Sequence, residues 1–297
     1  MHIDIDTDPY RITGDQPFVL SRYPHRIDDL YQDKDEYRDL LEEFQEEIDD
    51  LQRMMYAHDR YSLLLVFQAM DAAGKDSTIR HILSGVNAHG VVVHAFKQPS
   101  DEELEHDFLW RTTKRLPQRG RIGIFNRSYY EEVLVVRVHP TILTEGQRLP
   151  QEMIMDTERV WAQRYRAIRD FERHLYESGT QVVKFFLNLS QAEQARRFLA
   201  RIDEPEKNWK FSEGDVRERQ FWPQYMQAYE KAINATAAPH APWYVVPADD
   251  KKNMRLIVSQ VILEHLHKLD MGYPEVSDAR RDELQRYRAQ LEQELDG

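Results

Sequence analysis

The chain has 297 residues, and its 52 aspartates and glutamates outnumber 40 lysines and arginines, which gives a formal net charge of −12. This length allows one substantial core or at most two. The acidic balance argues against nucleic-acid binding, which needs a basic footprint. The sequence has no cysteine, which excludes disulfides and thiol chemistry and suits a reducing compartment.

The sequence gives no sign of a membrane segment. Its first ten residues, MHIDIDTDPY, are acidic and lack the apolar stretch of a signal peptide. No uninterrupted apolar run approaches the length that spans a bilayer. We therefore expect a cytoplasmic location and no membrane partner.

The N-terminal part is expected to cover a core. Residues 1–34 show no regular pattern and predict an irregular arm. Apolar residues then recur at helical spacing, with acidic residues between them: Tyr37, Leu40, Leu41, Phe44, Ile48, Leu51 and Met55. We expect residues 1–58 to form the arm and an amphipathic helix, and residues 59–270 to form the core.

Within that core, strands and helices are expected to alternate. Apolar, β-favouring runs predict five strands at residues 62–67, 90–96, 120–125, 181–189 and 243–246. Ser100 with Glu103, and Ser190 with Glu193, have capping-box spacing and should open two of the intervening helices. Longer helical stretches are predicted at residues 151–178 and 216–236. This alternation predicts an α/β fold of three layers, with a mostly parallel five-stranded sheet flanked by helices.

The segment 62–78, SLLLVFQAMDAAGKDST, is the strongest local motif. A strand runs into a turn of small residues that ends in Gly74-Lys75 and enters a helix, an arrangement that cradles phosphate. The candidate phosphate-binding loop is Ala72, Ala73, Gly74, Lys75, Asp76 and Ser77. Ala69 replaces the first glycine of the usual pattern, and Asp76 replaces the usual Ser or Thr. Asp71 inside the loop indicates a bridging Mg²⁺, because its charge would otherwise repel phosphate. An ordinary strand–turn–helix explains the loop alone nearly as well.

A basic island follows in residues 108–130, which contain no acidic residue. It indicates a local anion site, although a solvated helix face is the simpler explanation for each single member. Its cations are Arg111, Lys114, Arg115, Arg119, Arg121 and Arg127.

The same island contains the end of a predicted strand. Asn126 stands where a P-loop enzyme often carries the aspartate that positions Mg²⁺. Glu131, one helical turn on, could restore the missing charge. Arg127 is expected to face the same crevice, at the carboxyl ends of the strands.

Three later features remain open to more than one interpretation. Residues 202–215 are polar and lie between helices, so they could form a lid or a plain surface loop. The segment Asp249-Asp250-Lys251 follows a strand and could touch substrate, but a role in capping the next helix is favoured. Residues 271–297 predict a C-terminal helix whose apolar stripe packs on the body or on another subunit. The stripe is Leu284, Tyr287, Leu291 and Leu295.

Five ordered segments together resemble the family-2 polyphosphate kinases. They are FQAMDAAGKDST at 67–78, FKQPSDEELEHDFLWR at 96–111, GIFNRSYYEEVLVVRVHP at 123–140, RIDEPEKNWKFSEGDVRER at 201–219 and APWYVVPADDK at 241–251. The resemblance implies a P-loop kinase fold related to thymidylate kinase, with a helical lid at about 197–219. The Asn–Arg–Ser–x–Tyr–Glu form is similar to the subgroup called class III, which is associated with both AMP and ADP.

The activity that this resemblance implies is a reversible phosphoryl transfer. The terminal phosphoryl group of inorganic polyphosphate would move to AMP and ADP, giving ADP and ATP, with Mg²⁺ that Mn²⁺ could replace. Guanine nucleotides are further candidate acceptors, and a homodimer or homotetramer is expected. The rivals are an ATP-dependent nucleoside monophosphate kinase of the same fold and a non-catalytic nucleotide- or phosphate-binding module.

The resemblance also assigns roles to residues. Asp71, Lys75 and Arg127 would be the catalytic centre, completed by Asn126 and Glu131, and Asp71 and Glu131 would hold the metal. The polyphosphate channel would use Arg201, Lys207, Lys210, Arg111 and Arg121, with Arg197, Lys114, Arg115 and Arg119 as further cations. Four aromatic residues could stack on a base, and the residues themselves do not choose among Phe96, Trp110, Trp209 and Phe211.

Overall fold

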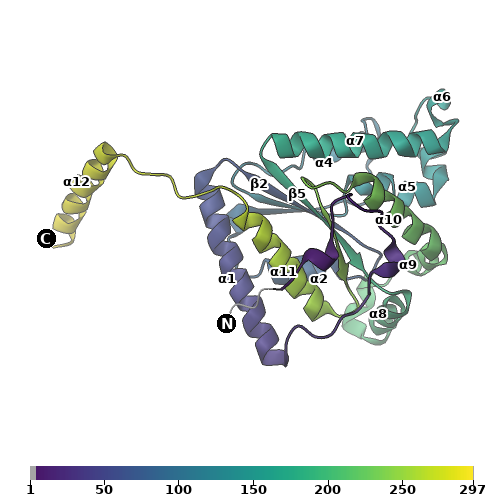
Figure 1. Ribbon diagram of the computed structural model, residues 1–297, viewed down its shortest axis with the longest axis horizontal. Helices are drawn as coiled ribbons and strands as arrows, with labels where there is room; N and C mark the ends of the chain where they lie inside the picture. The colour runs from purple at the N-terminus through teal and green to yellow at the C-terminus, as the bar shows by residue number, and fades with distance from the viewer. Residues whose placement is uncertain (1–4, 297) are drawn as a thin grey trace.

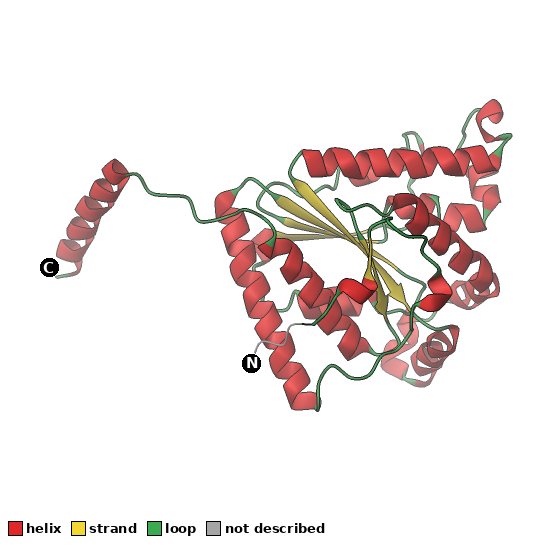
Figure 2. Cartoon of the chain, viewed as in Figure 1, coloured by secondary structure: helices red, strands yellow, loops and turns green. Residues whose placement is uncertain are grey.

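A computed structural model describes residues 5–296 of the chain. Figures 1 and 2 show a central sheet covered by helices, with one helix standing apart at the C-terminal end. The strands are β1 (Arg11–Ile12), β2 (Ser62–Gln68), β3 (Val91–Ala95), β4 (Ile122–Asn126), β5 (Thr180–Asn188) and β6 (Trp243–Pro247). The α-helices are α1 (Lys34–His58), α2 (Lys75–Ile82), α3 (Asp101–Leu104), α4 (Trp110–Thr113), α5 (Val135–Val138), α6 (Gln151–Ile154), α7 (Thr157–Glu177), α8 (Gln191–Asp203), α9 (Glu213–Glu218), α10 (Trp222–Thr236), α11 (Lys251–His267) and α12 (Asp278–Leu295).

The sheet has the strand order β1-β6-β5-β2-β4-β3. All five predicted strands are confirmed, and they run parallel to one another. The predicted strand count is wrong by one, because Arg11 and Ile12 pair antiparallel with Tyr244 and Trp243. A strand of two residues is too short to show an alternating pattern. The sequence therefore does not predict that part of the arm forms the outermost strand of the sheet.

The sheet is buried on both faces, which explains the continuous apolar run of β2. Successive side chains of a strand point to opposite faces. Leu63 and Leu65 accordingly pack with α1, α2 and α11, while Leu64 and Val66 pack with α7 and α10. The result is the predicted three-layer α/β architecture.

Local sequence signals set several helix boundaries. The Asp33 side chain accepts hydrogen bonds from two backbone N–H groups and opens α1, whose predicted apolar face is buried. Ser100 and Glu103 form the reciprocal capping box, and Ser190 accepts from the N–H of Glu193. Asp250 caps α11, as favoured from the sequence.

The two long helical stretches that the sequence predicts are each interrupted. The first divides into α6 and α7, with Asp156 capping the second helix. The other divides into α9, a 3-10 turn and α10, which carries Pro223 in its first turn. The segment before α9 forms a 3-10 helix at Pro205–Lys210 rather than an irregular loop.

Within residues 5–296, no helix combines the length and the apolar character that crossing a bilayer requires.

The buried His265 should make the fold sensitive to mild acid. It lies in α11, is 4% exposed, and its Nε2 is 3.0 Å from the Tyr244 hydroxyl. Burial lowers the pKa of His265 to about 3 from an ordinary value of 6.5. The neutral ring therefore stabilises the fold above pH 6.5, and this contribution is lost as the pH falls toward 3. Between pH 7.5 and pH 5.0 the loss from this residue is about 2 kcal/mol.

Urea denaturation of the wild type and His265→Gln at both pH values tests this expectation. Glutamine does not titrate and can still hydrogen-bond to Tyr244. The free energy of unfolding should fall less in the variant, by about 2 kcal/mol. Equal losses in both proteins would show that His265 does not set the acid sensitivity.

Candidate active site

The phosphate-binding loop joins β2 to α2 and has the strained backbone that such a cradle needs. Gly74 has φ 104° and Ala72 has φ 63°, in the left-handed region that non-glycine residues rarely adopt. Lys75 is the first residue of α2, and its Nζ donates to the carbonyl oxygens of Ala69 at 2.9 Å and Met70 at 3.4 Å. The lysine thus folds back over the loop, at the carboxyl end of β2.

The strand register brings the second predicted group of residues to this loop. Asn126 ends β4 opposite Phe67 of β2, and the N–H of Arg127 donates to the Phe67 carbonyl at 3.0 Å. Asn126 Nδ2 donates to Asp76 Oδ1 at 2.6 Å. The two motifs, distant in sequence, therefore meet at the same edge of the sheet.

Arg127 links two carboxylates across the site. Its Nη2 lies 2.7 Å from Asp71 Oδ1, and its Nη1 lies 3.7 Å from Glu131 Oε2. The backbone of Arg127 has φ 62°, which places another strained residue beside the phosphate loop. The structure brings together all five predicted catalytic residues, which are Asp71, Lys75, Asn126, Arg127 and Glu131.

Burial and charge shift the pKa values of this group in opposite directions. Burial lowers the pKa of Lys75, and the charge of Asp71 opposes that shift. Burial raises the pKa of Glu131, and Arg127 and Lys75 oppose it. Burial also acts to lower the pKa of Arg127, but the charges of Glu131 and Asp71 outweigh it and raise that pKa. Arg127 therefore stays charged, whereas for Lys75 burial outweighs the neighbouring carboxylates and the pKa is lowered.

A cavity of about 600 Å³ opens in front of these residues. The phosphate loop, Asn126 and Arg127 form one side, and the predicted lid forms another. Its cationic lining includes Lys75, Lys97, Arg127, Arg197, Arg201, Lys207, Lys210 and Lys251, and its acidic lining is Asp71, Asp76 and Asp215. Such a wall suits a highly charged anion, because arginine and lysine bind phosphate directly.

The predicted lid cations line this cavity, and two of them are paired with nearby carboxylates. Arg201 Nη1 lies 3.2 Å from Asp215 Oδ2, and Lys207 forms a close ion pair with Glu204. Lys210 Nζ lies 5.0 Å from the centre of the Trp209 ring.

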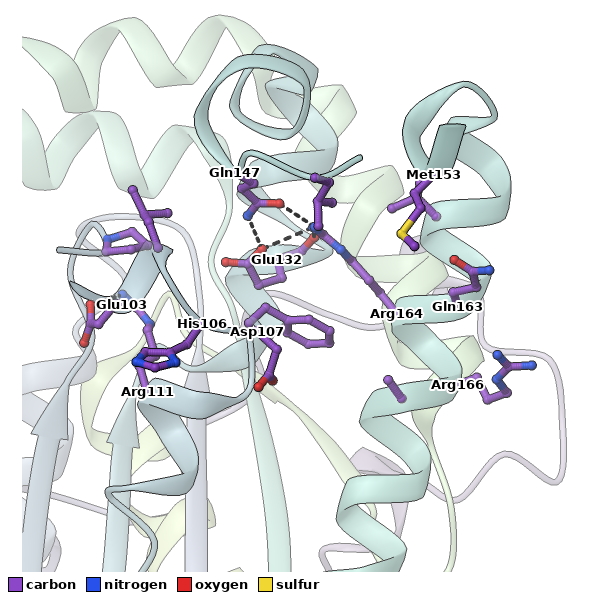
Figure 3. Close-up of a pocket in the computed structure, with 16 residues that line it drawn as sticks. Glu103, His106, Asp107, Arg111, Glu132, Gln147, Met153, Gln163, Arg164 and Arg166 are labelled. Atoms are coloured by element: carbon purple, nitrogen blue, oxygen red, sulfur yellow. Dashed lines mark hydrogen bonds and ion pairs between the residues drawn. The ribbon is translucent and has the colours of Figure 1, made fainter. Parts of the chain in front are cut away.

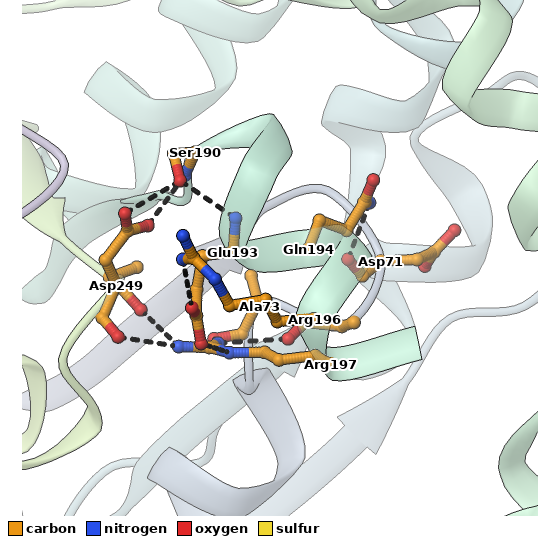
Figure 4. Close-up of polar contacts among 10 residues, drawn as sticks. Asp71, Ala73, Ser190, Glu193, Gln194, Arg196, Arg197 and Asp249 are labelled. Carbon is orange, nitrogen blue, oxygen red and sulfur yellow. Dashed lines mark hydrogen bonds and ion pairs between the residues drawn. The ribbon is translucent and has the colours of Figure 1, made fainter. Parts of the chain in front are cut away.

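Arg197, predicted as a further cation for polyphosphate, has all its hydrogen-bond donors occupied within the protein. It is 8% exposed, and its guanidinium donates to a carboxylate and four carbonyl oxygens (Figure 4). These acceptors are Glu193 Oε1 at 3.0 Å, the carbonyls of Ala72 at 3.0 Å and Ala73 at 2.8 Å, and those of Ala248 at 2.7 Å and Asp249 at 3.2 Å. A guanidinium has five N–H groups, so Arg197 uses its full capacity to hold the phosphate loop against α8 and the loop after β6.

Two residues assigned to the polyphosphate channel do not line the phosphate cavity. Arg121 directly precedes β4, and its carbonyl oxygen accepts a hydrogen bond from the N–H of Leu63. It therefore lies at the amino ends of the strands, whereas Asn126 lies at their carboxyl ends. Arg111 is buried, pairs with Glu103 at 3.1 Å and donates to the Lys97 carbonyl at 2.9 Å. The basic composition of this segment does not say which end of the sheet each charge occupies.

The cavity lining includes two residues that the sequence does not single out. Lys97 lies two residues after β3, and its position near the carboxyl end of a parallel strand is a signal that could identify it. Asp215 belongs to the segment 202–215, which the sequence predicts only as a whole to be a lid or a surface loop. Lys251, a possible substrate contact in the sequence, also lines the cavity, as the first residue of α11.

A second cavity of about 420 Å³ lies between the α3–α4 region and α7 (Figure 3). Phe108 and Leu104 contribute apolar walls. Arg164 lies over the Phe108 ring at 5.5 Å and donates to Glu132 Oε2 at 3.2 Å. A further cavity of about 400 Å³ shares Glu103 and Arg111 with this one and residues 95–98 with the phosphate cavity. The hollow surface therefore continues from the phosphate loop toward α7.

The four candidate aromatic residues differ in access. Trp209 is 78% exposed and lines the phosphate cavity. Phe96 also lines it but is buried against Phe125. Trp110 is stacked on His106 at 3.8 Å. Phe211 is partly buried, so Trp209 is the most accessible of the four.

A buried polar network supports the turn that carries Arg127 and Glu131. The hydroxyls of Tyr129 and Tyr130, which lie between them in sequence, both donate to Glu172 Oε1, at 2.9 and 2.8 Å. Lys184 of β5 lies 2.6 Å from Glu172 Oε2, and both side chains are at most 1% exposed. The buried pair of Glu172 and Lys184 thus holds the turn in place through the two tyrosine hydroxyls.

A phosphate-binding loop that opens into the helix after a parallel strand, a polar residue ending the neighbouring strand and a cationic lid define a P-loop kinase. The family model for polyphosphate kinase 2 (PPK2) matches residues 31–273, so this chain belongs to the PPK2 family. The predicted family resemblance is confirmed.

Relatives and solved structures agree with this assignment. The chain is 55% identical over 287 residues to the ADP-polyphosphate phosphotransferase of Rhodopseudomonas palustris, covering 97% of this chain and 99% of that one. It is 42% identical over 271 residues to the AMP/ADP-polyphosphate phosphotransferase of Meiothermus ruber, covering 91% and 96%. The crystal structure of polyphosphate kinase 2 from Arthrobacter aurescens TC1 superposes with a TM-score of 0.83 at 36% identity, covering 96% of this chain and 99% of that one.

Breaking the buried pair beneath the site should destabilise the protein. Glu172→Gln leaves the charge of Lys184 unpaired in the core, at a cost of about 3–5 kcal/mol. The double variant Glu172→Gln/Lys184→Met removes both charges and should recover much of that loss. Urea denaturation of both variants and of Lys184→Met measures the coupling. Additive effects would show that the two side chains do not act as a pair.

Proposed function

We propose that this protein transfers the terminal phosphoryl group of inorganic polyphosphate to AMP and ADP, reversibly and with Mg²⁺. The observation that carries the proposal is the placement of Lys75 and Arg127 at one end of a cavity whose other walls carry lid and strand-end cations. The names of the Rhodopseudomonas and Meiothermus relatives support the donor and the acceptors.

The proposed donor has no base or sugar, so charge and length are its only handles. Arg201, Lys207 and Lys210 lie on the lid side of the cavity. Successive cations of this kind suit a linear polyanion better than a single nucleotide tail. We therefore propose that polyphosphate enters along the lid and presents its terminal group to Lys75.

The transferred phosphoryl passes through a loose, highly anionic state, so the residues act by positioning and by electrostatics. Lys75 and the loop backbone would hold the group that moves. Arg127 would turn from Asp71 and Glu131 toward the charge that develops. Asp71 would orient the accepting phosphate, and Asn126 would keep Asp76 in place through their hydrogen bond.

The carboxylates that face the cavity fit a Mg²⁺-phosphate complex. The described residues contain no group of three His, Cys, Asp or Glu arranged to hold a metal by themselves. Mg²⁺ normally takes one or two carboxylates and completes its shell with phosphate oxygens and water. Asp71 and Asp76 line the cavity and would serve, whereas Glu131 does not line it. Mg²⁺, or Mn²⁺ in its place, would neutralise phosphate charge.

The nucleoside of the acceptor would lie in the hollow that continues from residues 96–98 toward Phe108 and Arg164. Its lining combines apolar side chains, among them Leu104, Phe108 and Met153, with polar and charged ones that could orient a small molecule. Guanine nucleotides remain candidate acceptors on the same grounds. We also propose a cytoplasmic location, where AMP and ADP are found, and assembly as a homodimer or homotetramer.

Product formation tests the proposal directly. The purified protein is incubated with Mg²⁺, long-chain polyphosphate and AMP, and separately ADP, with no ATP. Formation of ADP and ATP from AMP is the expected result. Product from ADP alone would contradict the dual acceptor, and turnover only with ATP as donor would favour the nucleoside monophosphate kinase alternative. Binding without any turnover would favour a non-catalytic module.

Substitution of the central residues should stop turnover without unfolding the protein. Lys75→Ala and Asp71→Asn should each lower kcat by at least about 100-fold, because one preorganised charge contributes that much or more. Circular dichroism and thermal unfolding check the fold, and Arg121→Ala, at the far edge of the sheet, is the matched control. Rates close to wild type in a folded Lys75→Ala would contradict the site.

Asn126 should influence the choice of acceptor. At present Asn126 Nδ2 donates to Asp76 Oδ1 at 2.6 Å. In Asn126→Asp two carboxylates face each other at this place, and they need a proton or a cation between them. We expect a changed ratio of AMP to ADP turnover and a changed dependence on Mg²⁺ concentration. The double variant Asn126→Asp/Asp76→Asn restores one amide and one carboxylate and should recover part of the change. An unaltered ratio would remove Asn126 as a determinant of selectivity.

A further inference from the structure

Helix α12 carries an apolar stripe that the body of the chain does not cover. Leu284, Tyr287, Leu291 and Leu295 are between 44% and 87% exposed. Their spacing of three, four and four residues puts them on one face of the helix. Figure 1 shows α12 projecting from the body at the end of an extended segment, and none of its described residues is buried.

The extended segment starts from a fixed point. His58 Nδ1 lies 3.1 Å from the Gly272 carbonyl oxygen, and Met271 packs against the core. Beyond Gly272 the chain leaves the body, and Tyr273 and Val276 are 61% and 42% exposed. The stripe is therefore presented away from the phosphate site.

Local interactions give this helix little stability of its own. Its 18 residues are only slightly more than the roughly 12–15 below which an isolated helix is marginal in water. Ion pairs along it, such as Arg281–Asp278 at 2.8 Å and Arg288–Glu292 at 2.9 Å, contribute only about 0.3–0.5 kcal/mol each. Burial of the apolar stripe against a partner would supply what these pairs do not.

The charges of α12 are divided unevenly along its length. Residues 278–288 contain four arginines and three carboxylates, whereas residues 289–296 contain three carboxylates and no cation. A second copy in antiparallel orientation would place the arginine-rich half of each helix against the acidic half of the other. A parallel pair would instead bring two acidic halves together and align the helix dipoles unfavourably.

We propose that α12 binds α12 of a second copy of this chain, antiparallel and about a two-fold axis. The stripe is then self-complementary, as a two-fold interface requires. Helix α12 is about 27 Å long, and the four side chains of its stripe cover far less than the roughly 800 Å² per partner of a standard interface. Pairing through α12 is thus a weak, concentration-dependent contact that leaves the two phosphate sites apart.

Sedimentation velocity over a wide range of protein concentration tests the stripe. Leu284→Gln/Leu291→Gln should weaken association about tenfold or more, because four leucines leave each dimer interface. The matched control Gln285→Ala/Gln293→Ala alters the other faces of the helix and should associate like wild type. Nucleotide turnover should stay unchanged in both, because the substitutions lie outside the phosphate site.

Orientation is tested by spin labels, since the chain has no cysteine of its own. Arg288→Cys puts one label near the middle of the helix and Ala279→Cys puts one near its start. An antiparallel pair gives a short distance between the two Arg288→Cys labels and a long distance between the two Ala279→Cys labels.

Three results would overturn the proposal. The first is a wild-type chain that stays monomeric throughout, whether α12 folds back on its own body or awaits a different protein. The second is association that the stripe variant does not weaken. The third is a short distance between the Ala279→Cys labels, which would establish a parallel pair.

Discussion

The phosphate site depends on one buried guanidinium. Arg197 ties two carbonyl oxygens of the phosphate loop to two of the loop after β6 and to Glu193 on its own helix. The loop carries a non-glycine residue, Ala72, in the left-handed region, a conformation that persists only when surrounding contacts enforce it. Arg197 supplies those contacts and thereby fixes the loop. The position of Lys75, which comes directly after the loop, depends on it.

Each carboxylate of the site already has a polar partner in the absence of substrate. Asp71 and Glu131 share Arg127, and Asp76 accepts from Asn126. Each anion therefore has a partner that a phosphate group and its counter-ion would have to replace. In the proposed reaction, this exchange would limit the net free energy gained on substrate binding and would leave more of the electrostatic stabilisation for the transition state.

Much of this arrangement could be predicted from the sequence, because short-range chemistry fixes it. The strand before the phosphate loop, the caps at Ser100 and Ser190, and the meeting of Asn126 with the loop follow from periodicity and from the rule that parallel strands end at one edge. The place of Arg121 at the far edge, and the internal role of Arg197, could not be read in the same way. Both are cations in basic or lid segments, and only the packing decides whether a guanidinium meets carbonyl oxygens or open solvent.

The lid pairs have a consequence for a substrate that is a polymer. Arg201 holds Asp215 and Lys207 holds Glu204, so each cation has an anionic neighbour ready to take the place of a departing phosphate. A chain that loses its last unit must advance by one unit before it can react again. If polyphosphate binds along the lid as proposed, Arg201 and Lys207 would exchange phosphate for Asp215 and Glu204 as the shortened chain advances, so that each advance would consist of small exchanges rather than one costly release.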